Sequence, residues 1–98
     1  MSTNLVAIHR MDKIYITNHV KLEILNICGV STIQPYNLNG YTALFTLGFS
    51  NTTHCKTLEK KLQEIALQYN TGKSITPNSI SVNLTVNQCV ELVMMKQI

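Results

Sequence analysis

Apolar and polar residues alternate along residues 13–25, KIYITNHVKLEIL. The apolar side chains occupy even positions, and only Asn18 breaks their phase. A period of two is typical of a half-buried strand. The pair Asn18-His19 falls where a tight turn would join two short strands, because asparagine tolerates the left-handed backbone that such turns require. An alternative ends the strand at Thr17 and uses Asn18 as the N-cap of a helix with an apolar stripe of Val20, Ile24, Ile27 and Cys28. We favour the two strands.

A second strand signal surrounds Asn39-Gly40, a pair typical of tight hairpin turns. Residues 32–38 and 41–49 would form the two arms of this hairpin. Pro35 lacks a backbone donor, so the first arm is expected at the edge of a sheet.

The period changes to that of a helix over residues 55–69. The apolar residues recur at steps of four, three, one and three, which draws one stripe along a helix: Leu58, Leu62, Ile65, Ala66 and Tyr69. Asn51, Thr52 or Thr53 can cap its start, and Gly72 is placed to end it in the left-handed conformation.

Alternation returns over residues 80–86 and predicts a strand there. Residues 87–98 fit either a last strand after an Asn87-Gln88 turn or a short helix capped by Asn87. We favour the strand, because Val90, Leu92 and Met94 keep the alternation. The elements together predict a single α+β domain over residues 1–98, a mostly antiparallel sheet packed by one long helix. A ferredoxin-like βαββαβ order is the alternative if residues 19–28 are helical.

Composition points to a folded protein with a weakly charged surface. Hydrophobic residues make up 45% of the chain, and charged residues make up 13%, about half the usual share. Part of this surface is therefore expected to be covered by a partner, and a homodimer is compatible with it. The net charge of +3 permits nucleic-acid binding without predicting it.

The sequence also predicts where the protein acts and which cofactors it lacks. It shows neither a secretory leader nor an apolar run long enough for a bilayer, so we expect it in the cytoplasm of a host cell, away from membranes. Three isolated cysteines, Cys28, Cys55 and Cys89, form no CxxC pair and are expected as reduced thiols. We expect no metal site and no cofactor.

Common catalytic motifs are missing from the sequence, and the five carboxylates form no acid–base pair. One cluster gathers hydroxyls, an imidazole and an ammonium at the start of the predicted helix, in residues 52–57. A helix start favours an anion, so His54, Lys56 and Lys60 would present a phosphate or nucleotide contact. The alternative is that the threonines cap the helix and the lysines are only solvated.

Three further residues are candidates for binding. Asn18 lies in the predicted turn, and Tyr36 and Tyr41 flank the predicted hairpin turn. On an exposed sheet face these two tyrosines and Tyr15 would contact a protein or stack on bases. The alternative for the three tyrosines is ordinary packing of a half-buried strand, and for Asn18 an ordinary turn.

The order of these features resembles the small viral ring-nuclease anti-CRISPR family. The resemblance lies in Lys-aliphatic-Tyr-aliphatic-x-Asn at residues 13–18, in His54 followed by Thr57, and in Asn78 before a strand. It implies that His54 is the acid in metal-independent cleavage of cyclic tetra-adenylate and that Asn18 contacts the ligand. The chain departs from the family where Gly-His is Thr53-His54 and Asn-Arg is Asn78-Ser79.

Two functions follow as hypotheses. The first is a small non-enzymatic binding protein, encoded by a virus or mobile element, that inhibits a host protein or ribonucleoprotein complex, as an anti-CRISPR does. The second is the ring nuclease with His54 as the catalytic residue. We favour the first, because it requires no catalytic constellation.

Overall fold

The computed structural model describes residues 10–50 and 52–94, with side chains from residue 13 onward. Over these residues the chain forms three α-helices and two 3-10 helices: α1 (Arg10–Cys28), η1 (Pro35–Asn37), η2 (Leu44–Leu47), α2 (Thr52–Gln68) and α3 (Val86–Val93). No strand or sheet is found in this part of the chain. The predicted α+β fold is therefore wrong, and so is its ferredoxin-like alternative.

Residues 13–25 form one continuous helix and not two strands. Consecutive positions on a helix are about 100° apart, so a step of two turns about 200°. Alternation therefore places apolar residues on two opposite sides of a helix. Ile16, Val20 and Ile24 lie on the inner side and are fully buried. Ile14, Asn18 and Leu22 lie on the other side, so Asn18-His19 is mid-helix and not a turn.

The alternative prediction that residues 19–28 are helical was closer to the structure, although the helix begins earlier, at Arg10. The helix ends where Gly29 adopts a left-handed backbone with φ of 72°. The Val30 N–H donates to the Leu25 carbonyl at 3.0 Å, and the Gly29 N–H donates to the Asn26 carbonyl at 3.2 Å. These two bonds form a Schellman motif, which satisfies carbonyls that the helix end leaves unpaired.

The long helix predicted over residues 55–69 is confirmed as α2. Its predicted stripe is buried, and only Tyr69, just past the helix, stays partly exposed. The helix ends at Gln68. Two residues later Asn70 has a left-handed φ of 53°, and the Thr71 N–H donates to the Ala66 carbonyl at 3.0 Å, which caps the helix end. Gly72 also has a positive φ but lies beyond this cap. Of the capping candidates, Asn51 lies outside the described residues.

The predicted hairpin of residues 32–38 and 41–49 is wrong, and so is the predicted strand over residues 80–86. The described residues contain instead one isolated antiparallel bridge, between Ala43 and Thr85. Residues 40–45 still lie beside residues 82–87: the Leu44 N–H donates to the Leu84 carbonyl, and the Val86 N–H donates to the Thr42 carbonyl, both at 2.9 Å. The extended backbone stops on one side because η2 begins at Leu44. It stops on the other because residues 81–84 turn and α3 follows at once.

The predicted last strand is also wrong, and the short-helix alternative is right, with Thr85 as the cap in place of Asn87. Thr85 and Gln88 form a capping box, in which the Gln88 N–H donates to Thr85 Oγ1 at 3.2 Å and the Thr85 N–H donates to Gln88 Oε1 at 2.8 Å. This reciprocal pair satisfies two donors at the start of a helix. The end of the tail, residues 95–98, lies outside the described part.

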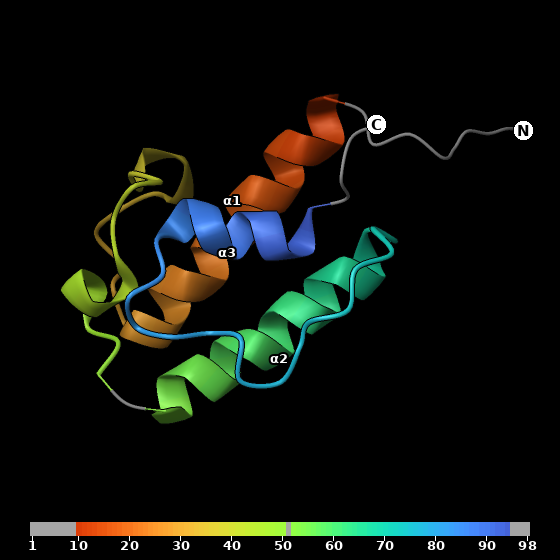
Figure 1. The fold of residues 1–98 in the computed structure, drawn as a ribbon. Helices are drawn as coiled ribbons and strands as arrows, with labels where there is room; N and C mark the ends of the chain where they lie inside the picture. The colour runs from red at the N-terminus through yellow and green to blue at the C-terminus, as the bar shows by residue number, and fades with distance from the viewer. Residues whose placement is uncertain (1–9, 51, 95–98) are drawn as a thin grey trace, which may run out of the picture.

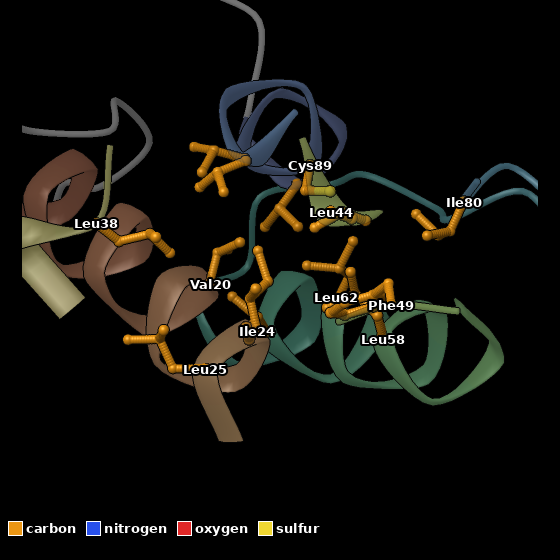
Figure 2. Close-up of a cluster of buried hydrophobic side chains, with 14 of the residues drawn as sticks. Val20, Ile24, Leu25, Leu38, Leu44, Phe49, Leu58, Leu62, Ile80 and Cys89 are labelled. Atoms are coloured by element: carbon orange, nitrogen blue, oxygen red, sulfur yellow. The ribbon is translucent and has the colours of Figure 1, made fainter. Parts of the chain in front are cut away.

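The core lies between the three helices. Figure 1 shows α1 and α2 running in opposite directions, and α3 contacts both of them. In Figure 2, Val20 and Ile24 from α1 point toward Leu58 and Leu62 from α2, with Cys89 of α3 above them. The connecting segments close the core with four buried side chains: Leu38, Leu44, Phe49 and Ile80.

Candidate functional site

The outer side of α1 is apolar and exposed, and η1 lies against the same helix. The exposed fractions are 48% for Ile14, 52% for Tyr15 and 42% for Leu22, with Tyr36 of η1 at 64%. We call these four side chains, together with Asn18, the α1–η1 face. A surface helix of a small globular protein normally turns a polar side to water, so this apolar outer side is the candidate binding surface.

Two open hollows meet at Asn18 within the α1–η1 face. The first has a volume of about 330 Å³, and its lining is Lys13, Ile14, Thr17, Asn18 and Tyr36. The second has a volume of about 370 Å³, and its lining is Tyr15, Asn18, His19, Leu22, Pro35, Gln68 and Tyr69. Both hollows are mostly apolar with a few polar groups, the usual composition of a protein's binding site.

The Asn18 side chain lies between the hollows, and within the described part of the chain its amide has no hydrogen-bond partner. It is half-buried, so water reaches it only in part. An amide offers both a donor and an acceptor. A group that covers the α1–η1 face must therefore bring a polar atom to Asn18 or leave this amide unsatisfied, which would weaken binding.

A carboxylate, an imidazole and a phenol line up beside the second hollow. Glu23 Oε2 lies 3.6 Å from His19 Nε2, and His19 Nδ1 lies 3.3 Å from the Tyr69 hydroxyl. A proton on Nε2 would face Glu23, which leaves Nδ1 to accept a hydrogen bond from Tyr69. The residues that line this hollow include no lysine or arginine to stabilise a developing negative charge. We therefore assign the trio a structural role: it ties the middle of α1 to the end of α2.

The cluster at the start of α2 is already engaged within the fold. His54 Nδ1 accepts a hydrogen bond from the Ser50 N–H at 3.3 Å, and its ring meets Phe49 edge-on at 5.6 Å. Lys56 Nζ donates to Asn78 Oδ1 at 2.7 Å, and the Asn78 N–H donates to a Glu59 oxygen at 2.7 Å. This carboxylate lines the same hollow of about 210 Å³ as Lys56 and opposes an anion there.

The structure brings together two of the predicted binding residues, Asn18 and Tyr36, which line the first hollow. Lys56 lies at the separate hollow beside Asn78, and Lys60 is exposed on α2. Tyr41 is 83% exposed and lines neither hollow of the α1–η1 face. Tyr15 was also expected to contact a partner, although on a sheet face, whereas sequence reasoning missed Ile14 and Leu22. The signal that could have found them is the four-residue spacing of Ile14, Asn18 and Leu22, which repeats that of the buried stripe two positions later.

The three thiols lie at different depths, and no group of metal-ligating side chains occurs among the described residues. Burial raises the pKa of the Cys89 thiol to about 12, with a smaller contribution from nearby Cys55. Burial likewise raises the pKa of Cys55, where Glu59 adds to the effect, and that of half-buried Cys28. A thiol with a raised pKa is a poor nucleophile at neutral pH, so these cysteines are structural.

The raised pKa of Cys89 predicts alkaline instability. An unfolded thiol ionises near its ordinary pKa of 9.0, whereas the folded thiol stays neutral until about pH 12. The contribution of the neutral Cys89 thiol to stability is therefore fully present below pH 9. Above pH 9 the free energy of unfolding falls by up to about 1.4 kcal/mol per pH unit. Urea unfolding at a series of alkaline pH values measures this slope. The Cys89→Ala variant should show a shallower slope, and an unchanged slope would contradict the assignment.

Comparison with known proteins adds no family to this description: no family model, curated protein or solved structure matches the chain. The resemblance to ring nucleases thus stays a prediction. Its first segment, residues 13–18, lies within α1. Among the described residues, no helix is both long and apolar enough to cross a membrane.

Proposed function

We propose that this chain is a small non-enzymatic binding protein that docks on another protein through the α1–η1 face. The observation that supports this most is the second apolar side of α1. Burying the inner side with Ile16, Val20 and Ile24 completes the core, yet Ile14, Tyr15 and Leu22 remain in water. Such exposure is unfavourable in a free monomer and becomes favourable when a partner covers it.

The composition of the α1–η1 face suggests how a partner would bind. Tyr15 and Tyr36 are the kind of side chain that supplies most binding energy at protein interfaces, since they combine a large apolar ring with a polar tip. The hollows beside them would accept side chains of the partner. Asn18 at the junction would select a partner with a polar group in the matching place.

A host protein or ribonucleoprotein complex is the proposed target, and a virus- or mobile-element-encoded inhibitor such as an anti-CRISPR is the proposed form. The small size and weak charge of the chain support this form, because an inhibitor that blocks a surface requires an interface and no catalytic site. An interface dominated by aromatic and aliphatic groups also favours a protein surface over bare nucleic acid, for which phosphate contacts would dominate.

Replacing Tyr36 by alanine tests the proposed face. Tagged wild-type protein would be used to capture partners from a host lysate, with and without nuclease, and the captured protein would be purified for titration calorimetry. Tyr36→Ala should weaken its binding by tenfold or more, about 1.4 kcal/mol or above, because an exposed aromatic anchor is lost. The matched control is Tyr41→Ala, which removes an even more exposed tyrosine outside the face and should leave the affinity unchanged.

Equal affinity of the two variants for the captured protein would contradict a role for the α1–η1 face. Cleavage of cyclic tetra-adenylate by the wild type, abolished in His54→Ala, would replace the proposal by the ring nuclease. If the protein is a binder, we expect the wild type not to cleave cyclic tetra-adenylate, and we expect His54→Ala to keep its affinity for the partner.

A further inference from the structure

We infer that, in the absence of a target, the α1–η1 face is covered by a second copy of this chain, with Tyr36 of each copy inserted into the first hollow of the other. This inference rests on the proposed function, because it concerns the same face. In the free protein a second copy of the chain thus occupies the face, and target binding has to compete with self-association.

The first hollow suits a phenol ring. The first hollow is open to solvent, and its volume of about 330 Å³ leaves room for a tyrosine ring to lie in it. Ile14 supplies an apolar wall, and Lys13, the one charged residue of the lining, can lie against the electron-rich face of a ring. Thr17 and Asn18 offer polar atoms for the phenol hydroxyl.

The α1–η1 face is also self-complementary. A twofold interface sets the same patch of two copies against itself, so the patch must contain both a projecting group and a hollow that receives it. Tyr36 projects with 64% of its surface exposed, and it stands on the rim of the first hollow. One twofold axis near Asn18 would therefore fill two hollows with two tyrosines. The amide of Asn18, which both donates and accepts, could pair with its own copy across that axis.

The size and charge of the face fit a weak dimer. From their exposed fractions, its four apolar side chains would bury roughly 400 Å², about half of the ~800 Å² that each partner buries in a standard interface. The polar residues around the hollows would add to this area. No carboxylate lines the first hollow, and its single cation would meet a neutral ring. The association is thus expected to be weak, so that the dimer forms only toward the upper end of the concentration range.

Sedimentation equilibrium of the full chain, from low micromolar to millimolar concentration, tests the inference. The wild type should move from monomer to dimer mass across this range. Tyr36→Ala should raise the dissociation constant about tenfold or more. Ile14→Lys, which adds a charge to the wall of the hollow, should act in the same direction, while Tyr41→Ala should leave the constant unchanged. Circular dichroism of each variant would verify that the helices are intact.

A monomer at all concentrations would overturn the inference, and so would a dimer that Tyr36→Ala and Tyr41→Ala weaken equally. The dimer and the proposed target binding can fail independently of each other. If the wild type is monomeric yet Tyr36→Ala still loses affinity for a captured target, the dimer is wrong and the binding face stands. If Tyr36→Ala breaks the dimer and leaves target affinity intact, the dimer stands and the target binds elsewhere.

Discussion

Replacing Ile24 by alanine is expected to lower the free energy of unfolding by about 2–5 kcal/mol. Its side chain is fully buried between α1 and its neighbours, and truncation would leave a cavity in the core (Figure 2). This loss is a large part of the total stability expected for a domain of this size. Urea unfolding followed by circular dichroism would measure it, provided that the transition remains two-state.

Leu22→Ala is the matched control, because Leu22 lies two residues away on the outer side of α1. Its loss should change the free energy of unfolding by about 0.5 kcal/mol or less. In a strand, residues 22 and 24 would share one face and the two substitutions would have similar effects. Equal losses would therefore contradict the two-sided helix, and a large difference supports it.

Placing proline at Asn18 is expected to cost about 3 kcal/mol or more. Proline would remove the helical hydrogen bond donated by residue 18, and its ring would meet the carbonyl of Ile14. The position lies in the interior of α1, eight residues after Arg10 and ten before Cys28. Thermal unfolding monitored by circular dichroism would show this loss together with reduced helix content.

Asn18→Ala is the control for this substitution. Alanine has a higher helix propensity than asparagine, and the amide of Asn18 has no partner among the described residues, so stability should stay the same or rise slightly. Proline, whose φ is fixed near about −65°, would also disrupt a left-handed turn at Asn18-His19, so the reduced helix content is the readout that distinguishes the helix from the turn. Equal stability of the proline and alanine variants would contradict a continuous α1.

The helix α2 could be predicted because its pattern has one explanation. Steps of three and four are incompatible with a strand, and every residue of the stripe is apolar. Asn70 shows the limit of such prediction at helix ends: the cap was expected at Gly72, yet asparagine also adopts the left-handed backbone, and the helix stopped at the first residue able to do so.

The helix α1 could not be predicted because alternation has two explanations. A period of two describes a strand with one apolar face, and it equally describes a helix with two apolar sides. Its β-branched residues, such as Ile14, Ile16 and Val20, made the strand more plausible because they favour extended backbone. Contacts with α2, η1 and α3 stabilise the helix in the folded protein, which local propensity alone would not ensure.

The residues of the proposed binding face were predicted in part and for a different reason. Asn18 and Tyr36 were proposed as residues of a turn and a sheet face, and they meet at the first hollow of a helical surface. In the predicted half-buried strands Ile14 and Leu22 would share the buried face with the other even-numbered apolar residues, because alternate positions of a strand lie on one side. Once residues 13–25 are helical, the same alternation explains both the core and the exposed face, so the error in fold and the missed site have one cause.

The most direct test of this account is an NMR measurement of Cα and Cβ chemical shifts, with amide–amide contacts between sequential residues, over residues 13–25. Continuous helical shifts and contacts through Asn18 and His19 are the predicted result, and they would establish one helix, which places Ile24 and Leu22 on opposite sides. Extended shifts on both sides of Asn18-His19, with cross-strand contacts between residues 13–17 and 20–24, would contradict it. That result would remove the α1–η1 face and the binding function built on it.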